Sequence, residues 1–136
     1  MPRRVELCRE ALKLVERKHD PGLCASVQNE LAYSLRQNPL GSRALNIEEG
    51  IEHHQLALQV NSRQAFPSQW AMTMNNLAAA YYDRIRGERA SNIEEAIFHA
   101  KLAVYTRQAA PEKWATTINN LLNAYSERIR GEPASN

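Results

Sequence analysis

The sequence PSQWAMTMNNLAAAYYDRIRG, residues 67–87, recurs as PEKWATTINNLLNAYSERIRG at residues 111–131, with 13 of 21 positions identical. The segment NIEEGI at residues 46–51 likewise recurs as NIEEAI at residues 92–97. A fixed internal spacing, here 44 to 46 residues, indicates stacked copies of one supersecondary unit. A fainter copy opens the chain, where three residues match Ile51, Ala57 and Leu58 of the later copy: Val5, Ala11 and Leu12.

Each copy contains two stretches with the apolar periodicity of a helix. In the longer stretch, apolar residues recur every three or four positions, as they do on one face of a helix. They are Trp70, Met74, Leu77, Tyr81 and Ile85, repeated as Trp114, Ile118, Leu121, Tyr125 and Ile129. The shorter stretch carries small residues such as Gly50 and Ala96, which allow a neighbouring backbone to approach closely. We expect Trp70, Trp114, Tyr81 and Tyr125 to lie in the core.

Turn and capping residues set the expected helix boundaries. Gly41, Gly87 and Gly131 stand where a left-handed residue would end a helix. Asn46 and Asn92 each precede a Glu by three residues, which predicts an N-cap with a reciprocal Glu contact. The expected helices span residues 3–18, 22–37, 46–63, 68–86, 92–108 and 112–130.

Composition indicates one helical domain without a strong charge bias. The 136 residues are 43% hydrophobic, and 17 Lys and Arg against 15 Asp and Glu give a net charge of +2. That balance is too mild to imply a nucleic-acid ligand. The N-terminus does not resemble a secretion signal, and no apolar run is long enough to cross a bilayer. Two cysteines, Cys8 and Cys24, are too few for a disulfide framework, so we expect a cytoplasmic protein with both thiols buried.

The motifs resemble the tetratricopeptide repeat. Leu77, Ala78 and Tyr81 match the first helix of that repeat, and Ala96 and Ala103 match the two alanines of its second helix. The stretch TMNNLA at residues 73–78 is similar to the long repeats of kinesin light chains. The whole unit, with its RIRG connector, resembles arrays attached to caspase-like proteases and to signalling ATPases.

The resemblance implies an all-α, right-handed superhelix of about six antiparallel helices. Residues 1–136 would form one array, with an orphan helix at 3–18, complete repeats at 22–63 and 68–108, and an orphan helix at 112–130. It also implies a non-catalytic scaffold that binds a peptide or partner helix in a concave groove. The groove residues would be Asn29, Tyr33, Arg36, Asn75, Asn76, Tyr82, Asp83, Asn119, Asn120, Asn123 and Glu127. The alternative for the repeated asparagines is a hydrogen bond to a neighbouring helix or loop.

No residue pattern indicates catalysis, a cofactor or a metal. His53 and His99 each follow a Glu by four residues, but the metal motifs with known mechanics need tighter sets. A second hypothesis is nucleic-acid or anion binding through recurring arginines: Arg84, Arg86, Arg89, Arg128 and Arg130. Interleaved acidic residues make this hypothesis the weaker one.

The terminal helices suggest an alternative function in self-assembly. The last helix keeps the apolar stripe of its counterparts, with no further helix in the sequence to cover it. We therefore expect either a piece of a longer array or a homo-oligomer, head-to-tail or two-fold, through the terminal helices. The expected interface residues are Val5, Leu12, Ile118, Leu122 and Ile129.

Overall fold

The computed structural model describes residues 2–15, 19–104 and 114–131, apart from the side chains of residues 2, 104, 114–118 and 131. This part of the chain contains helices and no strand, which confirms the expected all-α fold. The helices are α1 (Pro2–Leu14), α2 (Pro21–Gln37), α3 (Arg43–Leu58), α4 (Pro67–Asp83), α5 (Arg89–Val104) and α6 (Trp114–Gly131). None of these helices has the length and apolarity that crossing a membrane requires.

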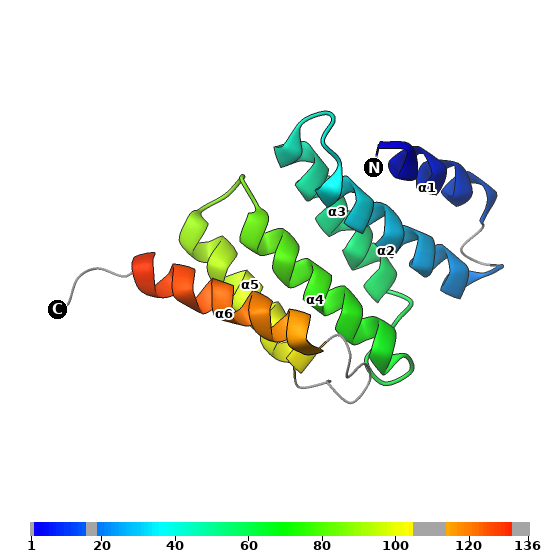
Figure 1. Ribbon diagram of the computed structural model, residues 1–136. Helices are drawn as coiled ribbons and strands as arrows, with labels where there is room; N and C mark the ends of the chain where they lie inside the picture. Colours follow the sequence, from blue (N-terminus) through cyan, green and yellow to red (C-terminus); the bar gives the residue numbers. More distant parts are fainter. Residues whose placement is uncertain (1, 16–18, 105–113, 132–136) are drawn as a thin grey trace.

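Successive helices pack beside one another along the molecule (Figure 1). The closest pairs are α2 with α3 and α4 with α5, and α4 also touches both α2 and α6. The even-numbered helices are therefore neighbours, as expected for helix pairs stacked as a repeat.

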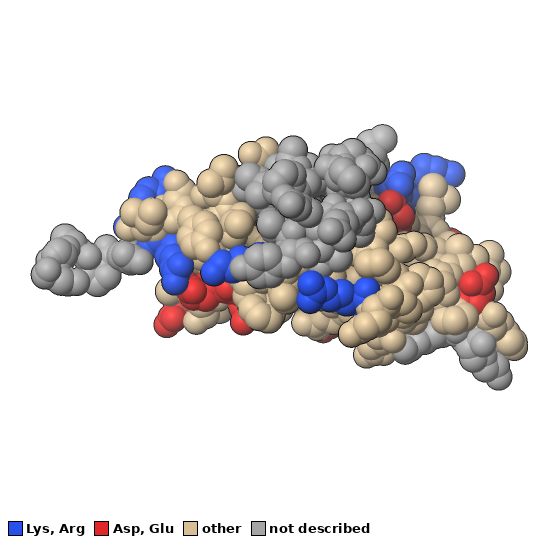
Figure 2. All heavy atoms as spheres, turned by 90° about the horizontal axis from the view of Figure 1, so that it is seen from below, with Lys and Arg blue, Asp and Glu red and all other residues tan. Residues whose placement is uncertain are grey.

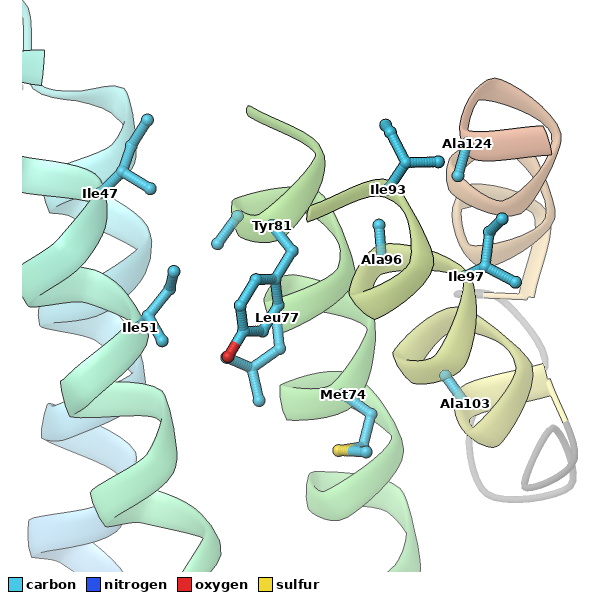
Figure 3. Packing of buried hydrophobic residues seen from close by; sticks show 11 residues of the cluster. Ile47, Ile51, Met74, Leu77, Tyr81, Ile93, Ala96, Ile97, Ala103 and Ala124 are labelled. Carbon is cyan, nitrogen blue, oxygen red and sulfur yellow. The ribbon is translucent and has the colours of Figure 1, made fainter. Parts of the chain in front are cut away.

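The main core is built from repeat-equivalent apolar residues (Figure 3). Ile47 and Ile51 of α3 face Leu77 and Tyr81 of α4, and Ile93 of α5 stands one repeat after Ile47. A second cluster joins α1 to α2 through Val5, Cys8, Leu31 and Leu35. Trp70 and Tyr125 are half-buried against the main core, and Tyr81 is buried within it, as the apolar stripe predicts. The side chain of Trp114 lies outside the described residues.

The predicted N-caps at Asn46 and Asn92 are wrong. Helix α3 begins three residues earlier, at Arg43, and its cap is Ser42, whose Oγ accepts a hydrogen bond from the Leu45 amide at 3.3 Å. The asparagines lie inside α3 and α5 and reach back to the connectors. Asn46 Nδ2 donates to the Leu40 carbonyl at 3.0 Å, and Asn92 Nδ2 donates to the Arg86 carbonyl at 2.8 Å. The Asn-x-x-Glu spacing therefore marks a side chain that fastens the connector.

For Gly41 and Gly87, the glycine prediction is right in conformation and wrong in position; Gly131 is the last residue of α6, as expected for a helix end. Gly41 and Gly87 have φ values of +79° and +83°, the left-handed region that glycine adopts without strain. Helix α4 nevertheless ends at Asp83, four residues before Gly87, and Arg84 is its cap. The glycines therefore turn the connectors just before α3 and α5. Helix α3 also ends earlier than expected, at Leu58.

Gly50 permits a close approach of α2 and α3. A Cβ atom at this position would lie 3.1 Å from the Ala32 carbonyl oxygen of α2. Gly50 therefore allows the backbones of α2 and α3 to approach closely, as expected from the sequence.

Candidate binding surface

Helices α2 and α4 present matching surface stripes. Residues spaced three and four apart are exposed or half-buried on both, and each α4 residue stands 46 positions after its α2 counterpart. We call this surface, with the equivalent described residues of α6, the even-helix face. Its members are Leu23, Ser26, Glu30, Tyr33 and Gln37 on α2; Gln69, Met72, Asn76, Ala79 and Asp83 on α4; and Asn120, Asn123 and Glu127 on α6.

Asn29, a predicted groove residue, joins three helices. His54 Nδ1 of α3 lies 2.9 Å from Asn29 Oδ1, which can only accept, so this ring nitrogen carries the proton. Asn29 Nδ2 donates to Thr73 Oγ1 of α4 at 2.9 Å. Thr73 Oγ1 in turn donates to the Gln69 carbonyl at 2.9 Å. We call these four residues the Asn29 chain, in which every bond runs in one direction from α3 through α2 to α4.

His54, the histidine of the Asn29 chain, is held neutral. His54 and Thr73 are 1% and 0% exposed. Burial, and then the positive charge of Arg36, lowers the pKa of His54 to about 3. A neutral imidazole that carries its proton on Nδ1 fits the direction of the hydrogen bonds in the Asn29 chain.

Asn75, the next predicted groove residue, is also engaged between helices. Its Oδ1 accepts a hydrogen bond of 2.8 Å from Asn120 Nδ2 of α6, and its side chain is buried. The histidine of the first copy is replaced by Ala100 in the second copy, so Asn75 has a different partner from Asn29. These two asparagines therefore use their amides for the contact between even-numbered helices.

The remaining predicted amides lie at the surface. Asn119 and Asn123 are exposed, and Asn76 is half-buried. Within the described part of the chain, the Asn76 amide makes no hydrogen bond and is not among the buried unpaired groups. Tyr33 is 43% exposed, with the Arg36 guanidinium 5.7 Å from its ring centroid.

Arg36 and Asp83, two more predicted groove residues, bind each other at one end of the even-helix face. Arg36 Nη1 donates to Asp83 Oδ2 at 3.1 Å. Arg43 joins them, since its Nη2 lies 3.5 Å from the same carboxylate oxygen and its Nη1 donates to the Arg36 carbonyl at 3.0 Å. One arginine after the connector thus fastens the end of α2 to the end of α4.

The same arrangement recurs one repeat later. Arg89, the counterpart of Arg43, donates through Nη1 to the Tyr82 carbonyl and through Nη2 to Glu127 Oε1 at 3.2 Å. Its guanidinium also lies 5.0 Å from the Tyr82 ring centroid. Tyr82 and Glu127 therefore take part in a repeated contact that joins α4 to α6.

The first arginine of each RIRG segment pairs with a carboxylate of the preceding helix. Arg84 binds Glu48 through Nε at 2.7 Å and Nη2 at 2.8 Å, and these bonds lower the pKa of Glu48. Arg128 repeats the contact with Glu94 at 2.9 Å. Figure 2 shows one face of the molecule, on which basic and acidic side chains lie next to one another. Arg84 and Arg128 are thus already engaged with carboxylates, which would compete with a nucleic-acid backbone for them.

His53 and His99 contact carboxylate, amide and aromatic side chains, and both cysteines are buried. His53 lies 3.4 Å from Glu49 Oε2 and also bonds Gln28, while His99 stacks on Tyr81 at a centroid distance of 5.0 Å. No group of three or more metal-ligating side chains occurs among the described residues. Cys8 and Cys24 are buried free thiols, and burial raises the pKa of Cys8.

The predicted interface residues of the terminal helices fall into two groups. Val5 is buried and Leu12 half-buried against α2 of the same chain, so neither is free for another molecule. Leu122 and Ile129 on α6 are 59% and 68% exposed. The side chain of Ile118 lies outside the described residues.

Several residues that organise this region were not predicted from the sequence. Arg43 and Glu48 could have been found, because both recur one repeat later as Arg89 and Glu94. Thr73 also recurs, as Thr117, whereas His54 carried no comparable signal, since alanine replaces it in the next copy.

No family model, curated protein or solved structure matches this chain.

Proposed function

We propose that the chain is a non-catalytic interaction module of the tetratricopeptide type, which binds an extended segment of another protein along the even-helix face. The support comes from the internal repeat, the packing of α2, α4 and α6 as neighbours, and the kind of side chains on the shared face.

One observation carries the proposal: the adjacent asparagines of α4 have different roles. Asn75 is buried and bonded to Asn120, whereas Asn76 keeps its donor and acceptor without a partner among the described residues. A side-chain amide offers two donors and an acceptor, which matches the alternating groups of an extended peptide backbone. Asn76 is therefore the first contact that we assign to a bound peptide.

The chemistry around Asn76 favours a peptide over a charged polymer. Tyr33 of α2 and Met72 of α4, 43% and 39% exposed, supply apolar surface on the same even-helix face. Arg36 and Asp83, the charges at one end of the face, already neutralise each other. The face thus has hydrogen-bonding groups and apolar surface, with little net charge to attract phosphate.

A peptide library displayed on phage and selected against the intact chain tests the proposal. Selected peptides should bind the wild-type chain and bind the Asn76→Ala variant about five- to tenfold more weakly, as expected for one or two lost hydrogen bonds. Tyr33→Ala should weaken the same peptides through lost apolar contact.

Glu52→Ala provides the matched control, because Glu52 is exposed on α3, away from the even-helix face. Its affinity for the selected peptides should equal that of the wild type. Peptides that bind the Asn76→Ala and Tyr33→Ala variants as tightly as the wild-type chain would reject this face as the binding site.

The proposal includes a cytoplasmic setting and no enzymatic activity. Two buried free thiols are compatible with a reducing compartment. The ion pairs of Arg84, Arg89 and Arg128 with glutamates support a protein ligand over a nucleic acid.

A further inference from the structure

Leu122 of α6 occupies a position that is buried in both earlier copies. Its counterparts are Ala32 of α2 and Ala78 of α4, each 1% exposed. Ala32 meets the following helix there, because its carbonyl lies against Gly50 of α3. Leu122, by contrast, is 59% exposed. The position through which α2 contacts its partner helix is therefore open on α6 and carries a larger apolar side chain.

Helix α1 also exposes apolar residues, at positions whose counterparts in α3 face α2. Leu7 and Leu14 are 55% and 84% exposed, and they stand 46 residues before His53 of α3 and Val60, which follows the end of α3 by two residues. Both counterparts face α2: His53 bonds Gln28, and Val60 lines a small pocket together with Cys24. The side of α1 that corresponds to the α2-facing side of α3 is thus apolar and open.

We propose that a second copy of this chain covers α6, with α1 of one molecule packing antiparallel on α6 of the next in the manner of α3 on α2. Three observations select this occupant. Helix α1 is already of the α3 type, because Val5 and Leu12 pack on α2 as their counterparts Ile51 and Leu58 pack in the main core. The open positions on both helices carry leucine. The exposed α1 residues three or four positions from Leu7 are Arg3, Arg4 and Glu10, and Arg4, which stands where Gly50 stands in α3, is already paired with Glu30 of α2 at 2.6 Å. The exposed α6 neighbours of Leu122, Asn119 and Ser126, are uncharged, so they bring no like charge to these residues.

The contact joins two different surfaces, so it is heterologous and continues from molecule to molecule. The mean mass should therefore rise with concentration beyond that of a dimer. The surface lies apart from Asn76 and Tyr33, so assembly and peptide binding can be measured separately, and failure of one leaves the other intact.

Sedimentation velocity on the intact chain over a hundredfold concentration range tests the proposal. The wild-type chain should show concentration-dependent association. Leu122→Glu and Leu7→Glu should each remain monomeric, because a buried carboxylate without a partner disfavours the contact by tenfold or more in association constant. Phe98→Glu is the control, since Phe98 is 56% exposed on α5 and outside the interface, and it should associate like the wild type.

Mixing the two variants distinguishes this arrangement from a two-fold pairing of α6 helices. The Leu122→Glu chain keeps an intact α1, and the Leu7→Glu chain keeps an intact α6. Their equimolar mixture should form a one-to-one dimer that does not grow, although each variant alone is monomeric. Circular dichroism should give both variants the helix content of the wild type, and Leu14→Glu provides a second α1 variant if Leu7→Glu unfolds.

Three results would overturn the proposal. The first is a wild-type chain that stays monomeric throughout the range. The second is a folded α1 variant that still associates alone, which would indicate α6 pairing. The third is a mixture of folded variants that forms no dimer.

Discussion

Arg84 holds Glu48 with two hydrogen bonds, of 2.7 and 2.8 Å, and so connects the end of α4 to α3. Arg128 and Glu94 form the same ion pair one repeat later, at 2.9 Å. Arg84 also lies 5.9 Å from the Tyr81 ring centroid and 3.3 Å from Asn92 Oδ1. One guanidinium thus contacts α3, α4 and α5 at the point where one repeat passes to the next.

We predict that Arg84→Ala lowers the free energy of unfolding by about 1–2 kcal/mol, because a partly buried, two-bonded ion pair and an interhelical hydrogen bond are lost together. Urea denaturation followed by circular dichroism measures the change. The neighbouring Arg86 is exposed and makes no ion pair among the described residues, so Arg86→Ala should stay within about 0.5 kcal/mol of the wild type. Equal losses for the two variants would contradict the assigned role of Arg84.

We predict that acidification destabilises the fold through His54. Burial lowers its pKa to about 3, so below pH ~6.5 the unfolded chain binds a proton that the folded chain does not. The contribution of His54 is complete above pH ~6.5 and is lost as the pH falls towards 3. Between pH 7 and pH 5 the free energy of unfolding should fall by about 2 kcal/mol.

The His54→Ala variant isolates this effect. It should be less stable than the wild type at pH 7, because Asn29 Oδ1 loses its donor, yet its stability should change much less between pH 7 and pH 5. Denaturation curves of the wild type and the variant at both pH values give the four free energies of unfolding to be compared. A variant that keeps the full pH dependence would show that other groups cause it.

We predict opposite outcomes for two asparagines that both belong to the predicted groove. Asn29→Ala removes the centre of the Asn29 chain, which leaves buried His54 Nδ1 without its acceptor and Thr73 Oγ1 without the donor from Asn29, so the free energy of unfolding should fall by about 1–3 kcal/mol. Asn76→Ala removes no described hydrogen bond and should change it by no more than about 0.5 kcal/mol. Thermal melts of the two variants side by side provide the measurement. A larger loss for Asn76→Ala would reverse the roles assigned to these residues.

We predict that Gly50→Ala destabilises the α2–α3 pair. The new Cβ would lie 3.1 Å from the Ala32 carbonyl oxygen, and the helices must separate to admit it. The overpacking cost exceeds the gain in helix propensity, for a net loss of about 1 kcal/mol in urea denaturation. Gly22→Ala is the control, because its nearest neighbouring atom would be 4.0 Å away. A more stable Gly50→Ala chain would show that α3 can shift freely.

The sequence predicted the helices and their pairing well, because the evidence was repeated along the chain. The apolar stripe around Leu77 and Tyr81 occurs more than once, and Met74, Leu77 and Tyr81 lie in the core, while its last member, Ile85, lies beyond the end of α4 and is exposed. The helix starts were missed, because an asparagine followed by a glutamate has the same spacing whether it caps a helix or binds a connector carbonyl. Asn46 does the latter.

The candidate site was harder to predict, since its chemistry depends on distances between helices. Asn75 and Asn76 are adjacent and both recur in the last copy, differing only in their first-copy counterparts, Asn29 and Glu30, yet one is bonded to α6 and the other has no described partner. In the same way, Val5 is plainly apolar, but only the packing of α1 shows that α2 of the same chain covers it. The sequence predicts whether a residue is apolar or hydrogen-bonding, but it does not predict which helix that residue contacts.

The matching connectors also bear on how such a chain can change length. Arg43 and Asn46 hold the first connector through the carbonyls of residues 36 and 40, and Arg89 and Asn92 hold the second through those of residues 82 and 86. A genetic crossover between the two connectors would join α2 to α5, or α4 to α3, with both fastening side chains still opposite their carbonyls. Unequal recombination at this junction would therefore remove or insert one helix pair while preserving the joint, so gain and loss of whole units is the change that the architecture tolerates most readily.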